Sequence, residues 1–328
     1  MKGSRLFEAL KLTAAVLVAA LVMFAFCACG GNNNTVTPTE APSDSPSSTP
    51  GDTTEDDPST IPQVVASDQF TKFDTTIAYV PEECTKILLA QDASTVEGQG
   101  ASVDGNKITI NMAGSYLISG TLTDGQIIVN VEKTEKVRLI LNGVTVTNTK
   151  SACIYVMSAD KVGITMAKGT ENVFTDASKY TEVDEKGNPN ACIYSKDDLT
   201  INGYGSLTVN GNYNNGIGTK NDLCIVTGTV TVKAPNNALK AKDSFRMHDG
   251  NVTVVSEDDA IKVDGEDDIS KGFIFIEGGT LTLTAADDAL TAVYNVTITG
   301  GHVTTYVDGK AVNCFGTVSI AAGTLDEK

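Results

Sequence analysis

The sequence contains no tryptophan, few other aromatic residues and little positive charge. Lysine and arginine number 24 against 41 aspartates and glutamates, which gives a formal net charge of −17. After residue 30 the only arginines are Arg138 and Arg246. Because nucleic-acid binding needs a basic surface, this composition excludes nucleic acid as a partner. Without tryptophan, the side chains available for stacking on sugar rings are the tyrosines Tyr155, Tyr194, Tyr204, Tyr213, Tyr294 and Tyr306.

Cysteine and histidine are also scarce. After residue 30 there are five cysteines, an odd number without CxxC spacing, which excludes both a disulfide framework and a zinc site. Cys153 and Cys192 lie in matching Ala-Cys-Ile-Tyr strings, and we interpret them as small buried residues rather than a stacked disulfide. The only histidines are His248 and His302, and no residue set suggests a catalytic triad.

The first 67 residues have the composition of a targeting segment and a tether. Residues 1–29 resemble a bacterial lipoprotein signal, with Cys29 as the lipidated residue; a single transmembrane anchor is the alternative. Residues 30–67 are rich in Ser, Thr, Pro and Asp, a composition that forms a disordered linker. The sequence therefore predicts an extracellular protein, lipid-anchored to the bacterial cell membrane, with one folded domain over 68–328.

The second half of the chain repeats about every 22 residues. The small residues that open the repeats are spaced by 22, 22, 29 and 22, so one repeat carries an insertion of seven residues: Gly216, Ala238, Ala260, Ala289 and Ala311. Seven positions after each of them, counting past the insertion, stands a large apolar residue: Leu223, Phe245, Ile274, Val296 and Val318. A fixed period with short alternating strands predicts an all-β solenoid, a right-handed parallel β-helix.

The first half is predicted to continue this architecture less regularly. Strand-like runs with turn signals fill residues 107–175, and residues 176–190 form a polar excursion. Residues 70–105 are expected to form an irregular cap that blocks edge-to-edge pairing.

Aspartate pairs precede two of the small residues. They are Asp258-Asp259 and Asp287-Asp288, where the two earlier repeats carry Asn214-Asn215 and Asn236-Asn237. Successive repeats lie about 4.8 Å apart, so stacked carboxylates repel one another unless a cation or a proton intervenes. Calcium, which accepts six to eight oxygen ligands, suits such a cluster; a solvated turn edge is the alternative. The insertion is expected to add carboxylates at the same end of the repeat, which gives the candidate metal ligands Asp258, Asp259, Asp264, Asp267, Asp268, Asp287 and Asp288.

Several segments resemble one protein family. They are Gly114–Leu122, Leu139–Gly143, Lys196–Ile201 and Asp258–Lys262. The family is that of the calcium-containing, carbohydrate-binding β-helix proteins first recognised in clostridia, which are similar in shape to polysaccharide lyases. The resemblance covers about 70–325. It implies a surface protein that binds cellulose or acidic sugars such as polygalacturonate, with calcium in the solenoid. Our leading hypothesis is that this binding module is non-catalytic. The family's Asp-Gly-Ile corner reads Asn-Gly-Ile and Asn-Ala-Leu in the repeats that begin at Gly216 and Ala238.

Two lysines beside the aspartates allow a second interpretation. Lys240 and Lys262 occupy equivalent positions in adjacent repeats, and with Tyr294 they are the candidate ligand-binding residues. A calcium-dependent polysaccharide lyase would use Lys240 or Lys262 as its base, unless ion pairs with aspartate raise the lysine pKa. An adhesive ladder of threonines is a third interpretation, which the ordinary preference of threonine for strands explains better.

Overall fold

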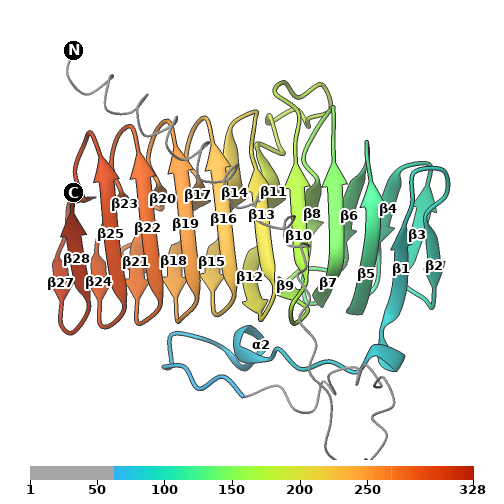
Figure 1. The fold of residues 1–328 in the computed structure, drawn as a ribbon, viewed down its shortest axis with the longest axis horizontal. Helices are drawn as coiled ribbons and strands as arrows, with labels where there is room; N and C mark the ends of the chain where they lie inside the picture. Colours follow the sequence, from blue (N-terminus) through green and yellow to red (C-terminus); the bar gives the residue numbers. More distant parts are fainter. Residues whose placement is uncertain (1–62, 267) are drawn as a thin grey trace, which may run out of the picture. The chain divides into compact units, whose positions relative to one another are not determined.

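The computed structural model describes residues 63–266 and 268–328, which belong to one compact unit. The predicted signal segment, its Cys29 and most of the linker lie outside the described residues, as does Asp267. The described chain is almost entirely β-structure (Figure 1), with one short α-helix, α2 (Lys72–Thr75), and one 3-10 turn, η2 (Pro81–Glu83). The all-β prediction is confirmed. In the part of the chain that the structure describes, no helix has the length and apolarity needed to cross a membrane.

The strands form two sheets, here called sheet A and sheet B. Sheet A has 18 strands: β1 (Thr85–Leu89), β2 (Thr95–Glu97), β5 (Gly114–Leu122), β7 (Lys136–Thr147), β9 (Lys161–Met166), β10 (Glu171–Thr175), β12 (Asp198–Gly203), β13 (Ser206–Asn210), β15 (Asp222–Ile225), β16 (Thr229–Ala234), β18 (Ser244–Met247), β19 (Asn251–Ser256), β21 (Phe273–Ile276), β22 (Thr280–Ala285), β24 (Val296–Ile298), β25 (His302–Val307), β27 (Val318–Ile320) and β28 (Thr324–Glu327). Sheet B has ten: β3 (Ala101–Asp104), β4 (Lys107–Ile110), β6 (Gln126–Asn130), β8 (Ile154–Ser158), β11 (Ala191–Ser195), β14 (Asn215–Thr219), β17 (Leu239–Ala241), β20 (Ile261–Val263), β23 (Leu290–Ala292) and β26 (Val312–Cys314).

Each repeat contributes one strand to sheet B and then two strands to sheet A. From β8 onward, each strand pairs in parallel with the equivalent strand of the next repeat, three strands later in the chain. Phe245 pairs with Leu223 on one side and with Ile274 on the other, so the seven-residue insertion leaves the ladder unbroken. These ladder positions are fully buried and form one continuous core. The 22-residue period therefore sets the strand register, as predicted.

The small residue at the start of each repeat lies at the beginning of a sheet B strand. Ile154, Ile193, Ile217 and Leu239 pair in succession, which puts Cys153 and Cys192 at the small-residue position of their repeats. Both thiols are free and buried, so their interpretation as small core residues is confirmed.

The expected cap at the start of the domain is more regular than the sequence suggested. β1 pairs antiparallel with β2, and β3 pairs antiparallel with β4. Such hairpins turn the chain back on itself at the end of a parallel stack and occupy the edge that another strand would otherwise join. The sequence signal for β2 and β3 was weak because these two strands are short and alternate between exposed and half-buried residues.

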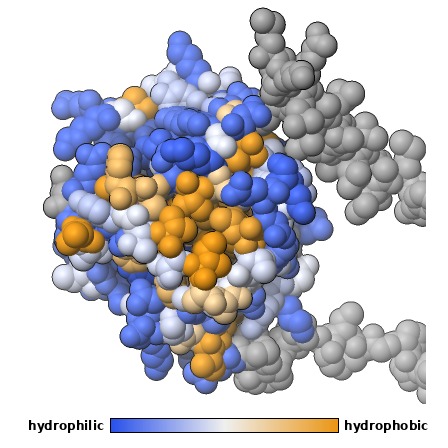
Figure 2. Space-filling view, turned by 90° about the vertical axis from the view of Figure 1, so that its left-hand side faces the viewer, coloured by the Kyte–Doolittle hydropathy of each residue, from blue (hydrophilic) through white to orange (hydrophobic). Residues whose placement is uncertain are grey.

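The two ends of the stack differ. At the end formed by β26, β27 and β28, apolar side chains reach the surface, including Phe315, Val318 and Ile320. Figure 2 looks onto this end and shows hydrophobic side chains gathered near its centre, surrounded by hydrophilic ones.

Candidate metal and ligand site

Four of the seven predicted metal ligands lie where the chain passes from sheet A to sheet B. Asp258 and Asp259 stand between β19 and β20, and Asp287 and Asp288 stand between β22 and β23. Ile261 pairs with Leu290, and the Ala260 amide donates to the carbonyl of Asp288 at 2.9 Å. The two pairs are therefore stacked, as the repeat predicts. We call these four residues the acidic corner.

Three of the four carboxylates converge. One oxygen from each of Asp258, Asp259 and Asp287 lies within 4.8 Å of the other two. Asp259 is buried, Asp258 is half-buried and Asp287 is exposed, so the cluster opens to solvent on one side. Burial and the neighbouring charges of Asp288, Asp259 and Asp258 raise the pKa of Asp287 above its usual value. Keeping these neighbouring carboxylates ionised costs free energy, and a bound cation would reduce that cost.

One lysine already neutralises part of this charge. The Lys262 ammonium lies 2.8 Å from Oδ2 of Asp259, whose Oδ1 accepts a 3.1 Å hydrogen bond from the Asp288 amide. Burial lowers the pKa of Lys262, but the hydrogen bond and charge of Asp259, with Asp258 and Asp264, outweigh it and the pKa is raised. The lysine is thus held in its charged form, as the ion-pair alternative in the sequence predicts.

Asp288 faces the next repeat rather than the other carboxylates. Its Oδ1 accepts from the Lys310 amide at 2.7 Å, and its Oδ2 accepts from Nδ2 of Asn313 at 2.6 Å. Both bonds tie the last aspartate pair to the following repeat, which carries Gly309-Lys310 at the same position. Asp288 is stacked with the cluster but is satisfied by other donors.

The insertion contributes less to the corner than its composition suggested. It follows β20, whereas the aspartate pair precedes β20, so the two lie at opposite ends of that strand. Asp264 pairs with Lys240 at 3.0 Å, and Asp268 accepts from the amide and hydroxyl of Ser270 in its own turn. Tyr294 donates to the backbone carbonyl of Glu266, which makes it a support of the insertion. The expected position of the inserted carboxylates, at the same end of the repeat, is corrected accordingly.

The two repeats before the acidic corner form an amide ladder. Nδ2 of Asn237 donates to Oδ1 of Asn215 at 3.0 Å, and Nδ2 of Asn236 donates to Oδ1 of Asn214 at 2.6 Å. The last acceptor of the buried ladder, Oδ1 of Asn237, has no hydrogen-bond partner among the described residues. The next residue of that ladder is Asp259, which has no donor to offer when it is ionised.

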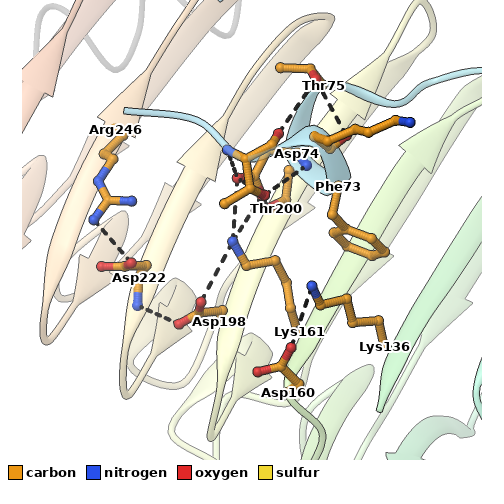
Figure 3. A network of polar contacts seen from close by, with 12 residues as sticks. Phe73, Asp74, Thr75, Lys136, Asp160, Lys161, Asp198, Thr200, Asp222 and Arg246 are labelled. Atoms are coloured by element: carbon orange, nitrogen blue, oxygen red, sulfur yellow. Dashed lines mark hydrogen bonds and ion pairs between the residues drawn. The ribbon is translucent and has the colours of Figure 1, made fainter. Parts of the chain in front are cut away.

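A second charged cluster lies under the segment that precedes β1 (Figure 3). Asp74 of α2 is fully buried and pairs with the buried Lys161 at 3.0 Å; it also accepts from the Thr200 hydroxyl. Burial raises the pKa of Asp74, but the charge of Lys161 and the hydrogen bonds from Thr200 and Thr71 outweigh it and lower that pKa. The cluster is saturated by its own partners and fastens residues 63–80 across sheet A, so we assign it a structural role.

Sequence reasoning missed a small hollow on the outer face of sheet B. The cavity has a volume of about 80 Å³ and is lined by Tyr194, Gly218, Lys220, Lys240, Lys242 and Asp264, among others. Register could have revealed it, because Tyr194, Gly218 and Lys240 pair in succession and the glycine leaves a gap in the row of side chains. The irregular spacing before Gly216 concealed that alignment.

Comparison with known proteins agrees with this architecture. Residues 104–326 match the family model described as carbohydrate-binding domain-containing protein. A protein of that description from Acetivibrio thermocellus is 48% identical over 242 residues, covering 73% of this chain and 85% of the relative. Among solved structures, a polysaccharide lyase-like protein from C. thermocellum, in a gadolinium derivative, superposes with a TM-score of 0.72 and 45% identity, covering 74% of this chain and 99% of that one.

Proposed function

The chain belongs to the family of carbohydrate-binding domain-containing proteins, and on that premise we propose that it is a non-catalytic, calcium-supported polysaccharide-binding protein of the bacterial cell surface. The ligand we propose is polygalacturonate or cellulose. The observation that carries the proposal is the convergence of three carboxylates beside two stacked lysines. The fold we propose is a right-handed parallel β-helix, supported by parallel pairing between equivalent strands of successive repeats.

The donor set of the acidic corner fits calcium. Asp258, Asp259 and Asp287 contribute three negative charges and Lys262 one positive charge, so a surplus of two negative charges remains for one divalent ion. Oxygen ligands at a solvent-open corner suit calcium, which accepts water and irregular geometry. The unpartnered Oδ1 of Asn237 adds a further buried oxygen beneath Asp259. When bound, calcium would screen the stacked carboxylates and attract the carboxylate of a uronate.

The neighbouring lysines provide the complementary charge for an acidic sugar. Lys240 and Lys262 pair in register on sheet B and are each about one-third exposed. Their ammonium groups can bind a uronate carboxylate without leaving their aspartate partners, because an ammonium has three donors. In a chain of net charge −17, a local pair of lysines is the feature that lets an acidic polymer approach.

The arrangement favours binding over lyase chemistry. A lyase base has to accept a proton, whereas Lys240 and Lys262 each donate to a carboxylate, at 3.0 Å and 2.8 Å. We therefore propose that the protein does not cleave its ligand. A product with the ultraviolet absorbance of an unsaturated uronide, lost in Lys262→Ala, would contradict this.

We further propose that Cys29 carries the lipid anchor and that residues 30–67 tether the domain at the cell surface. The support is the signal-like composition of residues 1–29. Cys29→Ser is expected to release the protein from the membrane fraction into the medium, which an immunoblot of the two fractions would show.

The central test is retention on polygalacturonate with calcium and with EDTA. Wild type is expected to bind only with calcium, and Asp258→Asn/Asp259→Asn is expected to lose that binding. The matched control is Asp160→Asn/Asp308→Asn, which removes the same charge at two exposed positions outside the cluster. Equal retention of wild type with and without EDTA would exclude a calcium bridge.

A further inference from the structure

A row of outward side chains crosses sheet B from the lysines toward the start of the domain. Its members pair in succession between parallel strands: Ile128, Tyr155, Tyr194, Gly218, Lys240 and Lys262. Neighbours in such a row lie about 4.8 Å apart, so the distance from Tyr155 to Lys262 is about 19 Å. The row therefore carries two tyrosines toward one end, which we call the aromatic end, and two lysines at the other.

At the aromatic end lies a second cavity, of about 220 Å³. It opens between the strands β6 and β8 and the polar excursion, and its lining includes Gln126, Tyr155, Met157, Glu182, Val183 and Asp184. Pockets for drug-sized ligands measure about 300–1,000 Å³, so this one has room for a single sugar ring.

One buried hydroxyl in this lining has no partner at hydrogen-bonding geometry among the described residues. Tyr155 is only 7% exposed, and its charged neighbour is Lys196, whose ammonium lies 5.4 Å from the centre of the Tyr155 ring and whose pKa is raised by its interactions with Tyr155 and Asp184. A buried hydroxyl is normally hydrogen-bonded, and leaving it unpaired costs free energy. A ligand hydroxyl in the cavity would satisfy it.

The polar excursion is held in place beside the cavity. Asn188 accepts a hydrogen bond from the Tyr194 hydroxyl and donates through Nδ2 to Asp184 at 3.1 Å. Hydrogen bonds, led by the one from the Asn188 backbone amide at 2.8 Å, lower the pKa of Asp184, so its carboxylate remains an acceptor. Preorganised acceptors of this kind reduce the entropic cost of binding.

The cavity lining also includes apolar side chains. Met157 and Val183 line it and are 39% and 45% exposed, although both are large hydrophobic residues. Together with the Tyr155 ring they offer apolar contacts for the C–H groups of a pyranose, and the carboxylates and amides of the same lining suit its hydroxyls.

The charge around the cavity indicates which sugar it would accept. Glu182 pairs with Lys107 at 2.7 Å and Asp184 pairs with Lys196 at 3.0 Å, so the charges are balanced. The lining of the 80 Å³ hollow, by contrast, contains three lysines, Lys220, Lys240 and Lys242, and one acidic residue, Asp264. An acidic sugar would gain nothing at the first site and would be attracted to the second.

We propose that the 220 Å³ cavity is a subsite for a neutral pyranose of the bound polysaccharide, with the Tyr155 hydroxyl as a hydrogen-bond partner and Met157 and Val183 as the apolar face. The inference rests on the proposed function, since it assumes that the ligand is a polysaccharide. It adds a calcium-independent subsite at the opposite end of the row from the acidic corner.

The test is isothermal titration of the folded domain with cellohexaose and xylohexaose, in calcium and in EDTA. At least one of these neutral probes is expected to bind wild type equally in both buffers. Val183→Arg, which fills the cavity from an exposed position, is expected to weaken that binding more than tenfold. Tyr155→Phe, which removes only the hydroxyl, is expected to weaken it about fivefold. Val80→Arg is the matched control, because Val80 is 48% exposed and lies outside the cavity.

The outcomes separate this inference from the proposed function. If neither neutral probe binds wild type, or if Val183→Arg binds as wild type does, the neutral subsite is wrong, whatever polygalacturonate does. If the neutral probe binds while polygalacturonate shows no dependence on calcium, the subsite stands and the proposed calcium bridge is wrong. Titration of Asp259→Asn with the neutral probe should match wild type, since that change leaves the cavity intact.

Discussion

The same corner of the repeat carries asparagine in two successive repeats and aspartate in the next two. Asn214-Asn215 and Asn236-Asn237 form one pair of ladders, and Asp258-Asp259 and Asp287-Asp288 continue them. Backbone position and strand register are shared. The comparison therefore isolates the effect of replacing an amide by a carboxylate in a stack of side chains.

The amides satisfy each other, and the carboxylates do not. Each asparagine offers a donor to the residue below and an acceptor to the residue above, so the ladder can extend without other groups. The aspartates instead use Lys262, backbone amides and Asn313 from the next repeat. At the junction, Oδ1 of Asn237 has no donor among the residues that the structure describes. A carboxylate ladder thus depends on cations or donors from outside, which is what makes it a candidate site.

The largest effect is expected when the carboxylate ladder is converted toward an amide ladder. Asp259→Asn removes one of three converging charges and supplies a donor toward Asn237. Calcium affinity should fall on the order of 100-fold, because calcium affinity depends steeply on the number of charged ligands. Calorimetric titration with calcium checks this, with Asp160→Asn as the control for net charge. An unchanged affinity would mean that the cation, if bound, does not use the acidic corner.

A buried carboxylate outside the ladder gives a further comparison, because within the described part of the chain it accepts hydrogen bonds but forms no ion pair with a lysine. Asp176 accepts from the Tyr180 hydroxyl at 2.6 Å and from the Asn212 amide, and burial raises its pKa from 3.8 to about 6. The folded protein binds the proton more tightly than the unfolded chain, so this contribution to stability is present below about pH 4 and is lost as the pH rises to about 6. The difference of about two pH units corresponds to about 3 kcal/mol.

The measurement for Asp176 is urea denaturation of wild type and Asp176→Asn between pH 4 and pH 7. The asparagine variant should lack this part of the pH dependence, since its side chain remains neutral. Parallel pH profiles for the two proteins would show that Asp176 ionises normally in the folded state.

Extending the acidic ladder by one repeat is expected to have a smaller effect. Asn237→Asp removes the donor to Asn215 and puts another buried carboxylate beside Asp259. In EDTA the free energy of unfolding should fall by about 2 kcal/mol, the order of an unsatisfied buried polar group. Calcium should restore part of this loss if the new carboxylate becomes a ligand. Chemical denaturation in EDTA measures the loss of stability, and the same experiment in calcium measures its recovery. Equal stability of variant and wild type in EDTA would contradict the expected repulsion between the new carboxylate and Asp259.

The repeat made much of this structure predictable, because a fixed period imposes a register. The pairing of Phe245 with Ile274 across the insertion and the stacking of Asp259 on Asp288 both follow from spacing alone. Contacts made by residues outside the 22-residue repeat could not be predicted from spacing. Asp74 reaches Lys161, 87 residues away, from a segment that belongs to no repeat. The pairing of Asp264 with Lys240 likewise depends on how the insertion folds, which neither spacing nor composition specifies.

The smallest expected effect compares the two stacked lysines. Lys262 pairs with an aspartate whose side chain is 3% exposed, whereas the partner of Lys240 is 40% exposed. Lys262→Gln should therefore lower the free energy of unfolding in EDTA by about 1 kcal/mol, and Lys240→Gln by less than about 0.5 kcal/mol, because solvent screens exposed ion pairs. The same Lys262→Gln change should tighten calcium binding about threefold, since it removes the positive charge that competes with the ion. A loss of stability without a gain in calcium affinity would show that the lysine and the ion do not share Asp259, and the acidic corner would then be held together by Lys262 alone.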